Sequence, residues 1–409
     1  MNIKTLIFRV MLTALAEISP ASAGTLDDYI EKLADHPQVT QLLEQSAHFQ
    51  ALSAAAMGLP DLQLIIGVDN VPIADPAFDR YLPTSKVIGF KQSIPSYSLR
   101  KAKSNQQKSR SKRQQLVADY TRRRLEAMLI GQLAELDKVS TLKNLRRRQL
   151  EYYRSIETDL KGQLEAGQPV YARFSELDVE RTKTEQRLND LQAEQIAIEA
   201  ELTQLVGEVP DIALPKVPNR TWRRASSALY PVVIASQDSQ VATKAVAVAD
   251  AAFHPNYSVQ AIYKQREASA DFSGADWFGV QATISLPLWQ GSNQKPKLRA
   301  AQAEKQRADL VYDDTLRQWV KRLSVLQAER DIARDNIALL KAKSRSIKSM
   351  VQAANRNYES GNTALETVLK AQIDELEIAA QLATQRSRYI RLGAQFNSHI
   401  IGSTHRADD

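Results

Sequence analysis

The sequence repeats one order of landmarks twice, with an offset of about 194 residues, and internal repeats mark units that fold alike. The recurring pairs are Pro37 and Pro231, Pro60 and Pro255, Pro95 and Pro287, and Gly167 and Gly361. A nearly constant offset indicates a tandem duplication. We therefore expect a first repeat over residues 24–207 and a second over 226–402. The proline-rich segment at 208–225 would link them.

Each repeat contains one helix of unusual length. Apolar residues recur at spacings of three and four over 96–164 and again over 295–358, which is the pattern of coiled-coil seams. At 1.5 Å per residue, each helix would be about 100 Å long, too long for a compact domain. The turn glycines Gly167 and Gly361 reverse the chain after these helices. The other helices should be shorter, over 26–57, 170–206, 226–253 and 364–401.

Two segments in each repeat alternate apolar and polar side chains, as half-buried strands do. They predict β-hairpins over 60–95 and 255–287. Within each strand, one face should carry alternate residues: Leu62, Leu64, Ile66 and Val68; Ile88, Phe90, Gln92 and Ile94; Tyr257, Val259, Ala261 and Tyr263; Val280, Ala282, Ile284 and Leu286. Each hairpin begins and ends at a proline, so we expect joints between strand and helix at Pro60, Pro95, Pro255 and Pro287.

Strands of about 10 residues can cross a bilayer when tilted, but only within a closed barrel. Four strands cannot close a barrel, and the eight of a dimer would nearly fill the interior with side chains. Three chains supply twelve strands, so we expect a homotrimer in contact with membrane lipid. The predicted fold class is mainly α with a small β part. Its long antiparallel helices would form a helical barrel, and its two hairpins would contribute to a 12-stranded trimeric β-barrel.

The N-terminus has the features of a secretory signal peptide over residues 1–23. Lys4 and Arg9 provide positive charge, VMLTALA is an apolar core, and Ala21-Ser22-Ala23 fits a cleavage site. The chain has no cysteine, which excludes disulfides, thiolate metal sites and an N-terminal lipid anchor. An exported chain of this kind suits the envelope of a Gram-negative bacterium. Residues 403–409 are expected to form a flexible tail.

Positive charge is concentrated between Arg100 and Arg124, where ten Lys and Arg residues accompany one acid, Asp119. Such clusters can bind nucleic acid. The chain has no nucleic-acid recognition motif, and a signal peptide argues against that partner. We interpret the cluster as a solvated helix face or a collar beside lipopolysaccharide.

The sequence contains no arrangement of residues that predicts catalysis. Its five histidines, His36, His48, His254, His399 and His405, are scattered without the spacing of a metal site. There is no nucleophile elbow, phosphate-binding loop or dinucleotide-binding glycine motif. We therefore expect neither an enzyme nor a bound cofactor or metal. His36 and His254 each precede a proline, which favours a hydrogen-bonding or boundary role.

The order of these elements resembles the TolC-type outer-membrane efflux proteins over almost the whole mature chain. The motifs are LEAGQPVYARFSELDVERTKTEQRL, NYESGNTALETVLKAQIDELEIAAQL, FKQSIPSYSLRKAK and ISLPLWQGSNQKPK. The resemblance implies a passive trimeric conduit in the outer membrane that extends through the periplasm. It also implies two partners, a periplasmic adaptor and an inner-membrane pump of the RND type.

The first hairpin is most similar to the heavy-metal branch of that family, which exports cobalt, zinc and cadmium or copper and silver. The similarity rests on GVDNVPIADPAFDR and PTSKVIGFKQSIP. It implies export of heavy-metal cations. A type I secretion or multidrug outlet of the same architecture is the alternative, and a soluble periplasmic coiled-coil scaffold is a second one.

The resemblance also points to the periplasmic entrance, where many relatives carry acids six and nine positions after the turn glycine. In this chain those positions hold Arg173 and Glu176 after Gly167, and Thr367 and Lys370 after Gly361. A lock of two carboxylates therefore cannot be carried over. Our hypothesis is that Arg173 and Lys370 close the tip by contacting Glu366 and Glu176. The alternative is that these are surface charges without a gating role.

Overall fold

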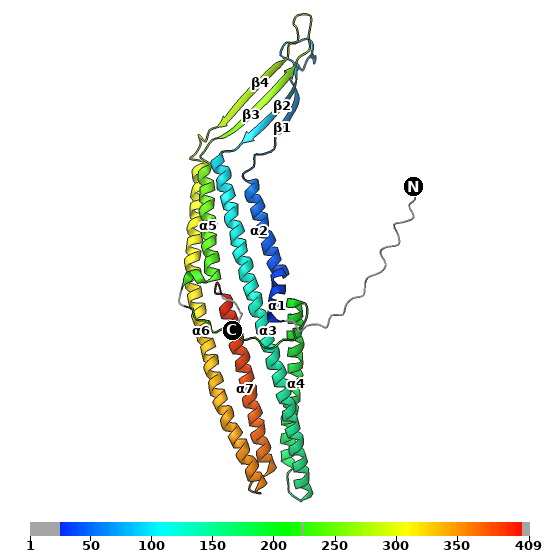
Figure 1. The fold of residues 1–409 in the computed structure, drawn as a ribbon. Helices are drawn as coiled ribbons and strands as arrows, with labels where there is room; N and C mark the ends of the chain where they lie inside the picture. Colours follow the sequence, from blue (N-terminus) through cyan, green and yellow to red (C-terminus); the bar gives the residue numbers. More distant parts are fainter. Residues whose placement is uncertain (1–24, 223–224, 403–409) are drawn as a thin grey trace, which may run out of the picture.

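The computed structural model describes residues 25–222 and 225–402. The predicted signal peptide at 1–23 and the tail at 403–409 lie outside the described residues. The chain forms a long rod of helices with a sheet at one end and two tight helical turns at the other (Figure 1). Among the described helices, none has an apolar stretch long enough to cross a membrane.

The two repeats build the same helical unit. The helices of the first repeat are α1 (Leu26–Lys32), η1 (Leu33–Asp35), α2 (Pro37–Ala55), α3 (Tyr97–Glu165) and α4 (Tyr171–Val206). Those of the second are η2 (Ser226–Ala228), α5 (Tyr230–Ala251), α6 (Gln294–Glu359) and α7 (Leu365–Ser398). In each unit two shorter helices lie end to end along the long one, α2 and α4 on α3, and α5 and α7 on α6 (Figure 1). Helix α3 also packs against α5 and α7 and so joins the repeats.

The prediction of one continuous helix over 26–57 is wrong, because the helix breaks at His36. Pro37 is the first residue of α2, a position that tolerates proline because its missing N–H would have no helical partner there. His36 caps the restarted helix, since its Nδ1 accepts a hydrogen bond from the backbone N–H of Gln38 at 3.3 Å. The helix expected over 226–253 divides for the same reason, with Pro231 in the first turn of α5.

The strands form one antiparallel sheet. They are β1 (Gln63–Asp69), β2 (Ser85–Ile94), β3 (Asn256–Gln265) and β4 (Trp277–Ser285), in the order β1-β2-β3-β4. The two hairpins thus pair through β2 and β3. In a single chain, β1 and β4 are edges whose outer backbone groups have no strand partner.

The strand register places the predicted apolar residues on one face. One row across the sheet is Leu64, Phe90, Ala261 and Val280, and the next is Ile66, Ile88, Tyr263 and Phe278. This face is open, with Ile66 74% and Phe278 72% exposed. The opposite face is more polar, with one row of Gln63, Lys91, Gln260 and Gln281, although the next row is Ile65, Gly89, Ile262 and Gly279. The sheet is therefore amphipathic, and its apolar face is not covered by the described part of the chain.

The buried core follows the helix seams in three clusters. One joins α1, α2, α3 and α4 around Leu129 and Leu202, both fully buried. A second joins α5, α6 and α7 around Leu323 and Phe396. The third lies near the helical tip around Leu160. The clusters lie in the middle of the rod and near its tip. Towards the sheet, buried serines join α2 to α3 through the hydrogen bonds Ser46–Ser111 and Ser53–Ser104, both 2.9 Å.

Candidate functional site

The two helical turns at the tip have the same backbone geometry. Gly167 and Gly361 have φ values of 85° and 75°, in the left-handed region that favours glycine. The Gly167 N–H donates to the Leu164 carbonyl at 2.9 Å, and the next N–H reaches back to Gln163 at 3.0 Å. The turn at Gly361 has the same pair of bonds, at 2.9 and 2.8 Å. This is the Schellman motif, so each long helix ends at the turn that the sequence predicted.

A cluster of charged residues connects the two repeats just above these turns. Arg173 of α4 forms an ion pair with Glu366 of α7. The Nζ atom of Lys370, one helical turn further along α7, lies 2.8 Å from the Glu366 carboxylate. The Glu366 side chain is only 14% exposed although it lies close to the end of the rod. One carboxylate therefore holds two cations at the tip.

The structure brings together three of the residues expected at the entrance and leaves two aside. Glu176 is exposed and forms no ion pair within the described residues, although it lines the same groove as Arg173 and Glu366. Thr367 is exposed, and its backbone N–H donates to the Ala364 carbonyl at 3.1 Å in the first turn of α7. Among the residues expected at the entrance, the ion pair between the repeats thus rests on the Glu366 carboxylate.

The four joint prolines lie just outside the strands. Pro95 directly follows β2 and Pro255 directly precedes β3. Two residues separate Pro60 from β1, and one residue separates Pro287 from β4. Proline has no N–H to donate and therefore ends the ladder.

Side-chain hydrogen bonds fasten the strands to the helices at these joints. The Asn256 carboxamide accepts from the Ser96 backbone N–H at 2.9 Å, joining the start of β3 to the start of α3. Arg100 donates to the Met57 carbonyl at 2.6 Å, and Gln92 donates to the Pro60 carbonyl at 2.8 Å. Sequence reasoning missed these roles, although Arg100 belongs to the basic cluster that it singled out.

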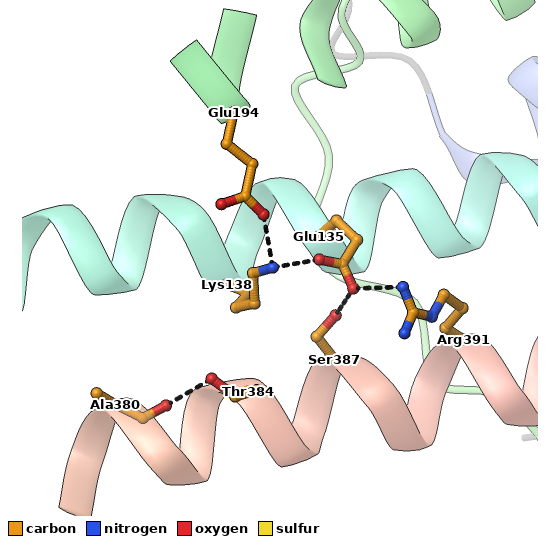
Figure 2. A network of polar contacts seen from close by, with 7 residues as sticks. All are labelled: Glu135, Lys138, Glu194, Ala380, Thr384, Ser387 and Arg391. Atoms are coloured by element: carbon orange, nitrogen blue, oxygen red, sulfur yellow. Dashed lines mark hydrogen bonds and ion pairs between the residues drawn. The ribbon is translucent and has the colours of Figure 1, made fainter. Parts of the chain in front are cut away.

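Sequence reasoning also missed a polar network midway along the rod (Figure 2). Glu135 of α3 accepts a hydrogen bond from Ser387 at 2.8 Å and lies 3.1 Å from the Arg391 guanidinium, both on α7. Its other oxygen contacts Lys138, whose Nζ also lies 2.8 Å from Glu194 of α4. The network therefore ties α4 and α7 to α3 at one level.

The electrostatics of this network favour its charged form. Burial by itself raises the pKa of the Glu135 carboxyl, but the hydrogen bonds from Lys138 and Ser387 outweigh it and bring the pKa below its usual value. Burial likewise acts to lower the pKa of Lys138, and its bonds to Glu135 and Glu194 raise that pKa above normal. Within the described residues, no group of three or more His, Cys, Asp or Glu side chains is arranged to hold a metal ion.

Residues 232–393, within the second repeat, match the family model described as Outer membrane efflux protein. No curated protein matches the chain by sequence. The fold is similar to that of several solved bacterial outer membrane proteins. VceC from Vibrio cholerae is 18% identical with a TM-score of 0.71, over 91% of this chain and 94% of its own. The Campylobacter jejuni CmeC channel is 13% identical with a TM-score of 0.73, over 93% and 87%.

The open-state MtrE channel of Neisseria gonorrhoeae is 14% identical with a TM-score of 0.75, over 91% of this chain and 88% of its own. These structures confirm the predicted fold class, mainly helical with a small antiparallel four-stranded sheet. They span both repeats, so the fold extends to the first repeat, which the family model does not match.

Proposed function

We propose that the chain is one subunit of a passive trimeric channel in the outer membrane of a Gram-negative bacterium, serving a tripartite efflux system. The observation that carries the proposal is the sheet, which has one open apolar face, one polar face and two free edges. In lipid, every backbone polar group must be satisfied by the protein, so a sheet can cross only as a closed barrel. Three copies joined from β4 to the next β1 give twelve strands around a polar lumen.

The helices support the same assembly. Val325, Ile332 and Leu339 lie seven residues apart on α6 and are exposed. Helix α6 packs on α5 and α7, so this ridge is available for another partner. A ridge of apolar side chains at heptad spacing is the contact surface of a coiled coil. We assign it to the neighbouring chain. A soluble scaffold would leave both this ridge and the apolar sheet face in water.

The barrel proposal is tested by placing one arginine on each face of β4. Val280→Arg puts a charge on the apolar face, where it costs about 2–4 kcal/mol near the bilayer midplane. Gln281→Arg, on the polar face, is the matched control. We expect Val280→Arg to reduce the heat-dissociable trimer recovered from outer membranes, and Gln281→Arg to leave the yield unchanged. Equal recovery of both variants would contradict the assignment of the two faces.

We propose further that the Glu366 cluster holds the periplasmic entrance closed. The support is that Glu366 joins α4 of one repeat to α7 of the other at the tip, and that rings of charge control ion entry. Glu366→Lys replaces an attraction with a repulsion from Arg173 and Lys370, so single-channel conductance in planar bilayers should rise. Glu176→Lys, in the same groove but without an ion pair there, is the control. Unchanged conductance of Glu366→Lys would leave these charges without a gating role.

For the substrate we propose heavy-metal cations delivered by an RND-type pump through a periplasmic adaptor. The support is the similarity of the first hairpin to the heavy-metal branch, with a multidrug or type I secretion outlet as the alternative. Deletion of the gene should sensitise the cell to zinc, cobalt, cadmium, copper or silver. Sensitivity to a drug panel alone would refute the metal substrate and favour the multidrug outlet.

A further inference from the structure

A cavity of about 810 Å³ opens on one face of the helical layer, midway along the rod. Its lining extends from the start of α2 and the end of α4, across α3 and α7, to α6. The cavity is therefore formed by helices of both repeats within a single chain. Neither the entrance nor the joints include it.

Two arginines in this cavity have no opposite charge bound to them. Arg124 of α3 and Arg322 of α6 form no ion pair within residues 25–222 and 225–402. The Arg322 guanidinium lies 4.8 Å from the ring centroid of Trp319, and that of Arg124 lies 5.9 Å from Tyr120. Contact with aromatic rings leaves the guanidinium N–H groups available to a ligand.

The two carboxylates in the lining form no ion pair with Arg124 or Arg322. Glu135 is bound by Lys138 and Arg391, and Glu201 accepts a hydrogen bond from Gln132. The lining holds three arginines, Arg124, Arg322 and Arg391, and two carboxylates, so it retains a net positive charge.

A buried histidine between the arginines has one unused polar atom. His399 is 4% exposed, and its Nδ1 lies 2.8 Å from the Tyr120 hydroxyl. Its Nε2 is buried and has no hydrogen-bond partner in the described part of the chain. Buried polar atoms are nearly always paired, so an unpaired one requires an explanation. With the Tyr120 O–H donating to Nδ1, the neutral ring carries its proton on Nε2 and can donate it.

We propose that this cavity binds an oxyanion, a carboxylate or phosphate group, attached to a small apolar body. Arg124 and Arg322 donate charge-assisted hydrogen bonds to the oxyanion, and the Nε2–H of His399 is a third donor. The apolar part of the ligand contacts Leu125 and the exposed Met128, which line the same cavity. This inference does not depend on the proposed channel function.

The test is isothermal titration calorimetry of the full chain, purified in a non-ionic detergent and a phosphate-free buffer, with phenyl phosphate as the probe. Arg124→Gln and Arg322→Gln should each weaken binding about tenfold or more, because each removes a charge-assisted contact. Arg317→Gln is the matched control, since Arg317 is exposed on α6 and does not line the cavity. Its affinity should equal that of the wild type.

Two further measurements make the result specific. Benzyl alcohol, which lacks the oxyanion, should bind at least tenfold more weakly than phenyl phosphate. His399→Phe keeps a ring without the donor and should lower affinity about tenfold; if it fails to fold, the exposed arginine variants still test the site. If phosphatidylglycerol in nanodiscs competes with phenyl phosphate, the natural ligand is a lipid headgroup. If phosphatidylglycerol does not compete, the natural ligand is a soluble solute. Equal binding of both probes, or wild-type affinity in the Arg124→Gln/Arg322→Gln double variant, would overturn the proposal.

Discussion

Acid should destabilise the helical rod through His399. Burial, together with the nearby positive charges of Arg322 and Arg124, lowers the pKa of His399 from 6.5 to about 4. The folded chain therefore keeps this imidazole neutral at pH values where the unfolded chain protonates it. Stability from this group is complete above pH 6.5 and falls as the pH decreases toward 4.

The size of the effect follows from the difference between the two pKa values. Each unit corresponds to about 1.4 kcal/mol, so the free energy of unfolding should fall by about 3 kcal/mol in each chain across this window. His399 is almost fully buried, so little of this is screened by solvent.

Thermal unfolding followed by circular dichroism, from pH 7 to pH 4 in a phosphate-free buffer at fixed protein concentration, measures this loss. His399→Gln should be less stable than the wild type at pH 7, because the bond from Tyr120 is weakened, yet it should lose less stability on acidification. His48→Gln, at an exposed position on α2, should keep the wild-type pH dependence. Parallel pH profiles for His399→Gln and the wild type would refute the reasoning.

Two further predictions concern stability and are measured in the same way. Gly167→Ala should lower the free energy of unfolding by about 1 kcal/mol, because Gly167 has a positive φ. Gly162→Ala lies in the last turns of α3, where no atom is within 4 Å of the new Cβ, and should raise the free energy of unfolding by up to about 1 kcal/mol. A loss of stability in both variants would contradict the assignment of Gly167 to the turn and Gly162 to the helix. Glu135→Gln should lower the free energy of unfolding by about 3 kcal/mol, because Arg391 and Lys138 lose their shared carboxylate. Glu194→Gln should lower it by less than about 1 kcal/mol, because the Glu194 carboxylate is more exposed. Similar losses in the two Glu variants would show that the network does not depend on Glu135.

The elements that sequence reasoning predicted correctly are those with a local or periodic cause. The long helices follow from spacings of three and four, and the register confirms the apolar face because residues such as Phe90 and Val280 alternate with polar neighbours. The two turns follow from Gly167 and Gly361, which supply a backbone conformation that other residues rarely adopt.

The features that sequence reasoning missed depend on contacts between distant residues, or on a local signal that is compatible with two structures. Pro37 is compatible with a helix boundary or a loop, so the pattern did not reveal the break at His36. The bond between Glu135 and Ser387 joins residues 252 positions apart, and the Tyr120–His399 contact joins residues 279 apart. No periodicity in one helix predicts which residue of another helix it will face. The contacts at the tip were predicted only in part, because Glu366 and Glu176 were both candidate partners and only Glu366 forms an ion pair with Arg173.

The packing of α3 against α5 and α7 has a consequence for assembly. This contact is an interface between two copies of one structural unit, and the linker at 208–225 keeps its two sides in the same molecule. In a closed ring of three such chains, half of the unit-to-unit interfaces would form intramolecularly, at an effective concentration in about the millimolar range. Dilution would act only on the other half. Fusion of two units into one polypeptide therefore lowers the number of encounters between separate molecules that ring closure requires, and it fixes the order in which unlike units alternate.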